Sequence, residues 1–292
     1  MDERQWMAER FEEHRARLRS VAYRMLGSLS DADDAVQETW LRLSGTAAGD
    51  VDNLGGWLTT VTARVCLNML RSRKRRREVE LPDPVVGPDD GPSPEDATVL
   101  ADSIGLALLV VLDTLSPAER VAFVLHDMFD LPFDEIAPLV GRTPTAARQL
   151  ASRARRRVRG ADPPPDTDLS RQRAVVNAFL AAARDGDFGA LTSVLDPDVV
   201  LRIDGGTAYP RGSMVVHGAD AVVRQALSGL QTTLRVAELR PAQVNGAAGI
   251  VILLRGRPAT IIGFSFRAGK IAGLNAIADP DRVAALASRF DG

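Results

Sequence analysis

Two clusters of basic side chains stand out in this sequence as groups suited to a chemical task. Between Arg71 and Arg77, six of the seven residues are Arg or Lys. A second group occupies residues 142–160, which contain seven arginines and no acidic residue. Like charges at this density repel one another, so a polyanion is the simplest compensating partner. A solvated, frayed helix end is the alternative explanation of the first cluster.

Catalytic and metal-binding patterns are weaker. The single cysteine, Cys66, excludes an internal disulfide and lies among apolar residues, and the three histidines lack metal-ligand spacing. An enzyme would need Asp204 or His217 as a general base, and no neighbouring partner is apparent for either. We therefore expect no catalytic residues, no metal and no cofactor. The net charge of −2 argues neither for nor against a nucleic-acid partner. An N-terminus unlike a secretory signal and the lack of a membrane-spanning apolar stretch predict a cytoplasmic protein without membrane contact.

Two proline-rich segments divide the chain. Residues 81–95 contain five prolines and two glycines, which favours an extended tether, and residues 160–168 form a second break. The resulting modules are a helical first part, a shorter helical second part and a mixed third part.

The first module contains a predicted amphipathic helix with an acidic outer face. Ala32, Val36 and Leu43 recur at helical spacing on the apolar face, and Ser30 with Asp33 resembles a capping box. The opposite face carries Asp33, Asp34, Gln37, Glu38 and Leu41. A second helix over residues 56–73 exposes Arg64, Asn68 and Arg71 on one side and runs into the basic cluster, which includes Arg73 and Arg75.

The second module has the pattern of a helix-turn-helix. Ser116, Pro117 and Glu119 form an N-terminal helix signal, and Gly141 separates two later helices. The last helix and its preceding turn carry polar residues suited to base edges and phosphates: Arg142, Thr145, Arg148, Gln149, Ser152, Arg153 and Arg156.

The third module has an α+β pattern. A helix that ends near Gly186 precedes a strand around Val199, and a helix over residues 219–230 follows. Strands are then predicted at 232–239, 249–254, 260–267 and 271–278, the last two joined by a hairpin turn at Ala268 and Gly269. Asp279 and Pro280 begin a terminal helix.

The helical modules resemble group-IV, or extracytoplasmic-function, sigma factors of bacterial RNA polymerase. DADDAVQETWLRL and GWLTTVTARVCLNMLRSRKRRRE resemble region 2, and residues 115–159 resemble region 4. The resemblance implies that Asp33, Asp34, Gln37, Glu38 and Leu41 contact the clamp coiled coil of the polymerase β′ subunit. It implies that Arg64, Asn68, Arg71, Arg73 and Arg75 contact the −10 promoter element, next to a base-capturing loop at residues 50–55. The seven polar residues of the last helix-turn-helix segment would read the −35 element.

The third module resembles the SnoaL and ketosteroid-isomerase superfamily, a cone formed by helices and a curved antiparallel sheet. Sigma factors fused to such a domain form a subgroup in which the added domain contacts the tether and modulates activity. The signatures concerned match here at Leu81, Pro82, Pro84, Asp204, Gly205, Gly206, Asp279, Pro280 and Asp281, although the tether lacks the subgroup's usual tryptophan. We expect packing of residues 81–84 near residues 204–206.

The predicted organisation is region 2 at 8–78, a tether at 79–100, region 4 at 101–160, a linker at 161–169 and the SnoaL-like domain at 170–292. The predicted function is promoter-specific transcription initiation with core RNA polymerase, modulated by the C-terminal domain. Two alternatives stay open at this point. A one-component helix-turn-helix regulator that senses a small molecule would leave the first module without a role. A SnoaL-type isomerase or hydrolase would leave both basic helices unexplained.

Overall fold

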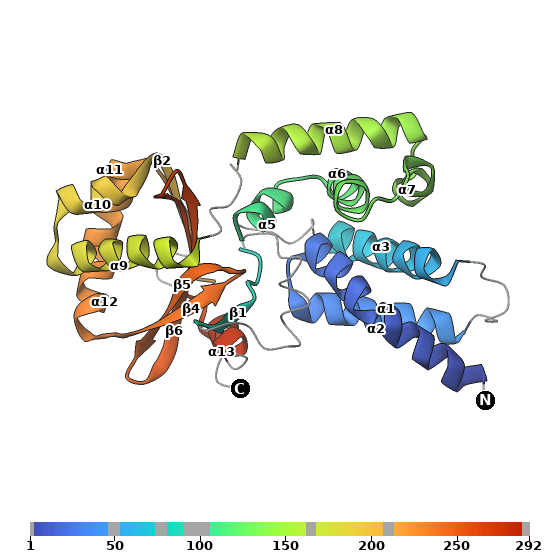
Figure 1. Ribbon diagram of the computed structural model, residues 1–292, viewed down its shortest axis with the longest axis horizontal. Coiled ribbons are helices and arrows are strands. Elements are labelled where there is room, and N and C mark those ends of the chain that lie inside the picture. The colour runs from blue at the N-terminus through green and yellow to red at the C-terminus, as the bar shows by residue number, and fades with distance from the viewer. Residues whose placement is uncertain are drawn as a thin grey trace. The chain divides into compact units, whose positions relative to one another are not determined.

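The computed structural model describes residues 3–45, 53–73, 81–89, 106–161, 168–206 and 213–287. The chain forms two compact units: residues 1–77 with 108–161, and residues 78–107 with 162–292 (Figure 1). The helices of the first unit are α1 (Glu3–Leu26), α2 (Leu29–Ser44), α3 (Leu54–Arg73), α5 (Leu106–Asp113, from its third residue), α6 (Pro117–Phe123), the π-helical turn η2 (Val124–Met128), α7 (Phe133–Val140) and α8 (Pro144–Ala161).

Helices α1, α2 and α3 share one apolar core. Val36 and Leu43 of α2 are buried against α1 and α3, and the hydroxyl oxygens of Thr39 and Thr62 lie 3.0 Å apart. The capping prediction for α2 is wrong by two residues: Ser28 is the N-cap and accepts a hydrogen bond from the Asp31 amide. Ser30 lies inside the first turn, because the helix already begins at Leu29.

The helix-turn-helix prediction is confirmed. Ser116 and Glu119 form a complete capping box at the start of α6, with the Glu119 amide 3.4 Å from the Ser116 hydroxyl oxygen. Gly141 ends α7 with a φ of 65°, a left-handed conformation that glycine adopts without a steric penalty.

Arg120 joins the two helical modules within the first unit. Its side chain is 2% exposed, and its Nε donates to the carbonyl oxygen of Arg24 in α1 at 3.2 Å. Its Nη1 donates to Asp113 Oδ1 in α5 at 3.0 Å, so a charged side chain lies inside this packing with a carboxylate partner.

The second unit is built on a seven-stranded sheet with the order β1-β4-β5-β6-β7-β2-β3. Its strands are β1 (Val86–Pro88), β2 (Leu195–Asp204), β3 (Met214–His217), β4 (Glu238–Val244), β5 (Ala247–Leu254), β6 (Arg257–Arg267) and β7 (Lys270–Ile277). Its helices are α9 (Leu169–Asp185), α10 (Phe188–Val194), α11 (Ala219–Gln225), the π-helical turn η3 (Ala226–Leu230), α12 (Gln231–Val236) and α13 (Pro280–Ala287).

Helices and sheet of the second unit enclose a common core, as Figure 1 shows for α9 beside the strands. Phe179 of α9 meets Phe264 of β6 edge-on, with ring centroids 6.0 Å apart. Register shifts in the β5–β6 and β6–β7 pairs bend the sheet at irregular positions. Ala268 and Gly269 both have positive φ angles, which confirms the predicted hairpin turn. The predicted α+β class is confirmed.

Two details of the C-terminal prediction are wrong. The strand predicted at residues 232–239 begins only at Glu238, because the helical segment continues through α12 to Val236. The sheet is also mixed, since β2 pairs parallel with β7 and antiparallel with β3. Leu234 is buried from α12, so its apolar side chain belongs to a helix rather than to the predicted strand.

Candidate nucleic-acid interface

Helix α2 presents the acidic face, which we define as Asp33, Asp34, Gln37, Glu38 and Leu41. Four of these side chains are exposed and Glu38 is half-buried, whereas the other side of the helix lies in the core. Asp33 pairs with Arg19 at 2.7 Å, and Glu38 pairs with Arg42 one turn away at 3.1 Å. Leu41 is 56% exposed. The carboxylates give this face a negative charge, which the phosphates of DNA would repel.

Helix α3 presents a polar stripe that consists of Thr60, Arg64, Asn68 and Arg71. Arg64, Asn68 and Arg71 are exposed, and their spacing of three or four residues keeps them on one side of the helix. Arg73 lies in the last turn of α3, and its side chain is outside the described atoms. Arg75 and most of the predicted base-capturing loop lie outside the described residues, which resume at Asn53.

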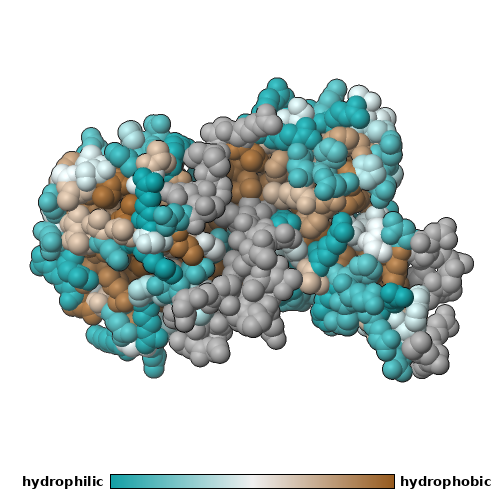
Figure 2. Space-filling model, viewed as in Figure 1, coloured by the Kyte–Doolittle hydropathy of each residue, from teal (hydrophilic) through white to brown (hydrophobic). Residues whose placement is uncertain are grey.

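Helix α8 and the turn before it carry the third candidate surface. All seven residues predicted there are exposed: Arg142, Thr145, Arg148, Gln149, Ser152, Arg153 and Arg156. Figure 2 shows mainly hydrophilic residues along α8. The opposite side of α8 is apolar, since Ala147, Leu150, Ala151 and Ala154 are buried.

Glu119 binds two of the α8 arginines, which the sequence did not reveal. Its Oε1 accepts from Arg153 Nε at 3.2 Å and its Oε2 from Arg157 Nη1 at 3.0 Å. Burial by itself would raise the pKa of Glu119, but hydrogen bonds from Ser116 and the two arginines lower it below its ordinary value. Arg153 is therefore oriented by the protein, while Arg148 packs over the Phe133 ring at 5.4 Å.

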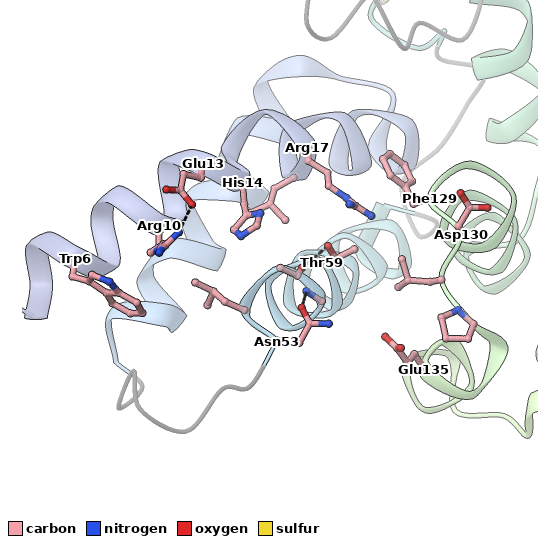
Figure 3. A pocket seen from close by; sticks show the side chains of 16 residues that line it. Trp6, Arg10, Glu13, His14, Arg17, Asn53, Thr59, Phe129, Asp130 and Glu135 are labelled. Carbon is pink, nitrogen blue, oxygen red and sulfur yellow. Dashed lines mark hydrogen bonds and ion pairs between the residues drawn. The ribbon is translucent and has the colours of Figure 1, made fainter.

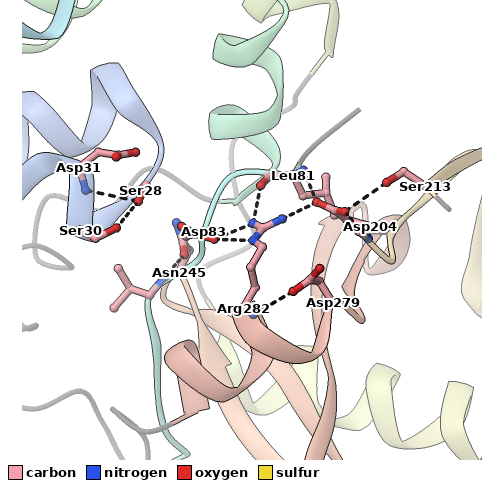
Figure 4. Close-up of polar contacts among 12 residues, drawn as sticks. Ser28, Ser30, Asp31, Leu81, Asp83, Asp204, Ser213, Asn245, Asp279 and Arg282 are labelled. Carbon is pink, nitrogen blue, oxygen red and sulfur yellow. Dashed lines mark hydrogen bonds and ion pairs between the residues drawn. The ribbon is translucent and has the colours of Figure 1, made fainter. Parts of the chain in front are cut away.

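In the second unit, the tether segment (residues 81–89) is fastened to the C-terminal fold (Figure 4). The Leu81 amide donates to Asp204 Oδ2 at 2.7 Å, and Arg282 of α13 donates to the Leu81 carbonyl oxygen at 2.6 Å. Arg282 Nε also donates to Asp83 Oδ1 at 2.9 Å, and Nη1 forms an ion pair with Asp204. Leu81 and Asp204 are thus bridged by one guanidinium group.

The remainder of the tether segment continues this attachment. Val85 exchanges hydrogen bonds with Asn245, and residues 86–88 form β1 against β4 at the sheet edge. Asp89 pairs with Arg173 of α9 at 2.8 Å. The predicted extended conformation is correct for these residues, and the extended chain is bound as an edge strand.

The predicted C-terminal signatures contribute unequally to this attachment. Asp204 is buried and also accepts from the Ser213 hydroxyl and the Gly206 amide. A Cβ at Gly206 would lie 1.9 Å from Asp279 Oδ2, so glycine is required there. Asp279 caps α13 through the Arg282 amide, whereas Pro280 and Asp281 are exposed. Arg282 belongs to the same C-terminal signature but was not among the predicted contact residues, although it is a cation one turn after Asp279.

Family models match both helical modules. The model described as Sigma-70 region 2 matches residues 10–76, and that described as Sigma-70, region 4 matches residues 105–158. The protein named ECF RNA polymerase sigma factor SigJ of Mycobacterium tuberculosis is 39% identical over 293 residues, covering 93% of this chain and 91% of the relative. A second relative from the same species, named as a probable ECF sigma factor SigI, is 36% identical and covers 96% of this chain and 95% of its own length.

The chain belongs to the extracytoplasmic-function sigma factors of RNA polymerase. A crystal structure of the M. tuberculosis sigma factor SigJ matches it with a TM-score of 0.76 at 36% identity, over 97% of this chain and 99% of that one. The match includes the C-terminal part, so this sigma factor shares the appended α+β domain. It directs transcription initiation by binding core RNA polymerase and promoter DNA.

The alternative of a catalytic cone finds little support in the geometry of this sigma factor. An apolar cavity of about 120 Å³ lies between the helices and the sheet, lined by residues such as Phe179, Leu201 and Ile262. Neither Asp204 nor His217 lines it, and Asp204 is engaged by Arg282 and Ser213. Sigma factors as a family are not enzymes.

No described helix is long and apolar enough to cross a membrane.

Proposed function

We propose that this sigma factor docks on the clamp coiled coil of the polymerase β′ subunit through the acidic face of α2, and reads the −10 and −35 elements through α3 and α8. The tether segment and the C-terminal domain then modulate this activity. The observation that carries the proposal is the sorting of surfaces by sign. The acidic face offers carboxylates and an apolar side chain, whereas the outer sides of α3 and α8 offer arginines and amides.

The acidic face suits a protein partner for an energetic reason. Leu41 loses apolar exposure only when another surface covers it, and burial of a leucine side chain contributes about 1.5–3 kcal/mol. The surrounding carboxylates would be repelled by DNA and attracted by a basic protein surface. Asp34, which is exposed, is available to such a partner in addition to the paired Asp33.

The basic faces suit DNA in two different ways. On α8, Arg148, Gln149 and Ser152 lie toward the helix N-terminal half, where a recognition helix contacts bases. Arg156 lies one turn further on and suits a phosphate. On α3, Arg64 and Asn68 are the groups proposed to read bases. They are followed in the sequence by Arg71, Arg73 and Arg75, whose charges would attract the phosphate backbone of DNA.

The proposed modulation rests on where the tether segment is fixed. The tether connects the module that reads the −10 element to the module that reads the −35 element, whose spacing on DNA is set by the promoter. Attachment of residues 81–89 to the C-terminal domain shortens the chain that remains free to span that distance. The residues proposed to carry this modulation are Leu81, Pro82, Pro84 and the two signatures around Asp204 and Asp279. The proposed domain boundaries are those predicted from the sequence. The C-terminal domain would act here as a regulator without a catalytic step.

Promoter selection by single-residue variants tests the proposal. Templates with randomised −35 positions are transcribed by holoenzyme that contains Arg148→Ala, Arg153→Ala or, as a control in the other unit, the exposed Arg184→Ala. We expect each α8 variant to lose preference at its own base pair by about 5- to 150-fold, since a bidentate contact contributes about 1–3 kcal/mol. Preferences that match those of the wild type in both α8 variants would contradict the assignment of α8.

A further inference from the structure

The cavity between the helices and the sheet of the second unit, which we call the C-terminal cavity, differs in chemistry from the larger cleft of the first unit. That cleft, of about 640 Å³, is lined by charges of both signs, among them Arg10, Arg17, Asp130 and Glu135 (Figure 3). The C-terminal cavity has a volume of about 120 Å³, and none of the described residues that line it is charged. It is therefore suited to an uncharged molecule.

The floor of the C-terminal cavity is apolar and buried. Its side chains come from α9, α11 and four strands of the sheet: Phe179, Leu201, Val222, Ile252, Ile262, Leu274 and Ala276. Water finds no hydrogen-bond partner between such walls, whereas an apolar cavity of about 150 Å³ holds a benzene molecule. The floor therefore has room for about one ring.

Hydrogen-bonding groups lie at the rim of the cavity. Gln225, Thr233 and Thr260 line it and are half-buried, so they lie between the buried floor and solvent. The Thr233 hydroxyl donates to the Gly229 carbonyl oxygen at 3.3 Å, and its oxygen can still accept a hydrogen bond. The Gln225 side-chain amide can donate one. A hydroxyl group on the ring would thus meet an acceptor and a donor.

A π-helical turn shapes this rim. In η3 the Gln231 amide donates to the carbonyl oxygen of Ala226, five residues earlier. Such turns interrupt α-helices mostly as single turns and often at functional sites. Gln225, Gly229 and Thr233 follow one another at intervals of four residues along this segment, and all three line the cavity. The irregular turn therefore contributes one continuous side of the rim.

Two further lining residues connect the cavity with the attachment of the tether segment. Ile203 and Ala278 line the cavity and directly precede Asp204 and Asp279 in the chain. The Ala278 amide donates to the Asp204 carbonyl oxygen at 2.7 Å, which joins the two segments. The Asp204 carboxylate accepts from the Leu81 amide of the tether segment (Figure 4). A molecule that packs on Ile203 and Ala278 would therefore stabilise the segments that hold the tether.

We propose that the C-terminal cavity binds an uncharged, single-ring molecule with a hydroxyl group, and that binding strengthens the attachment of the tether segment. The ring occupies the apolar floor, and the hydroxyl donates to Thr233 and accepts from Gln225. A charged ring is excluded, because no described lining residue would compensate its buried charge. An effect of this molecule on transcription rests on the proposed modulation, whereas its binding and its effect on the tether do not.

Calorimetric titration of the full-length chain tests the binding step, with benzene, phenol and benzoate as probes. The variant Ala226→Leu enlarges a buried side chain that lines the cavity, and the control Ala181→Leu makes the same change at an exposed position of α9 outside the lining. Thr233→Val keeps the shape of the side chain and removes its hydroxyl group, so it tests the rim without filling the floor.

We expect wild type to bind phenol at least about tenfold more tightly than benzoate, because the carboxylate would lose its hydration without a partner. Ala226→Leu should lose phenol binding and Ala181→Leu should keep it. Thr233→Val should weaken phenol binding by about 2- to 12-fold, the range for one hydrogen bond, and leave benzene binding unchanged. Absence of phenol binding in wild type, equal binding of phenol and benzoate, or undiminished phenol binding in both Ala226→Leu and Thr233→Val would overturn the assignment of the cavity.

Hydrogen–deuterium exchange of the Leu81 amide tests the effect on the tether segment. Saturating phenol should slow this exchange about fivefold or more in wild type, the lower end of typical coupling between two sites, and should not change it in Ala226→Leu. Unchanged exchange in wild type with phenol bound would overturn the coupling. If phenol binds and slows exchange but leaves transcription by the holoenzyme unaltered, the proposed modulation fails and the inference stands.

Discussion

Replacement of Arg282 by methionine should release the tether segment from the C-terminal domain. Methionine keeps an unbranched side chain of similar length but lacks the guanidinium donors that bind Leu81, Asp83 and Asp204. The Asp204 side chain is only 3% exposed, so its carboxylate would remain buried without its cation. Loss of one partner of a buried ion pair costs about 3–5 kcal/mol.

The lower end of this range is appropriate, because the Ser213 hydroxyl and the Gly206 amide still donate to Asp204 and the Asp83 side chain is 26% exposed. A cost of about 3 kcal/mol corresponds to a population of the released tether that is about 150 times larger. The Leu81 and Val85 amides, which donate to Asp204 and Asn245, would exchange with solvent correspondingly faster.

Hydrogen–deuterium exchange of the full-length chain measures this directly. The control is Arg240→Met, which removes an exposed ion pair with Glu238 in the same unit and should leave tether exchange unchanged. Unchanged exchange of the tether amides in Arg282→Met would refute the reasoning. An equal rise throughout α9 and the sheet would refute it as well, because that pattern reports loss of the whole fold rather than release of the tether.

Three further predictions concern the first unit. Leu41→Asp should weaken binding to core polymerase by at least about tenfold without changing thermal stability. The control Leu254→Asp, at an exposed leucine in the other unit, should bind core polymerase as the wild type does. Equal affinities of Leu41→Asp and wild type for core polymerase would contradict the docking surface. Glu119→Gln should lower the free energy of unfolding by about 1–3 kcal/mol at pH 7. Because the pKa of Glu119 is lower in the folded state, its contribution to stability is present above the ordinary pKa of about 4.5 and is lost as the pH falls through the folded-state pKa. Urea unfolding at pH 3.5 should therefore show a smaller difference in unfolding free energy between Glu119→Gln and wild type than at pH 7. A difference of the same size at both pH values would contradict the assignment. Burial raises the pKa of Cys66 to about 12, so the thiol should resist alkylation until the chain unfolds. The free energy of unfolding should also fall between about pH 9 and 12, because the thiol proton leaves the unfolded chain at a lower pH than the folded chain. Rapid labelling of the native protein would contradict the packing.

The helices of the first unit were predictable from the sequence because local signals and burial agree there. Ser116, Glu119 and Gly141 have the same roles in the structure as in the pattern. The N-cap of α2 was misplaced because three candidate caps, Ser28, Ser30 and Asp31, occur within four positions, and only packing selects among them. The exposure of Arg148 and Gln149 followed from helical periodicity, but the ion pairs of Arg153 and Arg157 with Glu119 did not, because Glu119 lies on a different helix.

The C-terminal unit was predictable in class and less so in detail. Short apolar runs separated by turn residues predicted β5, β6 and β7. Around Leu234, a short helix and a strand of similar hydrophobicity could not be distinguished. Nothing local indicates that Val86 joins β4, because the pairing partner, Val244, is far away in sequence. Prolines correctly predicted an extended chain there, but an extended chain reveals its partner only through tertiary contacts.

Run-off transcription tests the central claim most directly. Wild-type chain is mixed with core RNA polymerase and a pool of linear templates whose −35 and −10 positions are randomised, and the transcripts are sequenced. Transcripts that require the chain and share one pair of sequence elements at a fixed spacing are the predicted result. Binding of the chain to duplex DNA without core polymerase, together with no chain-dependent transcripts, would contradict the account.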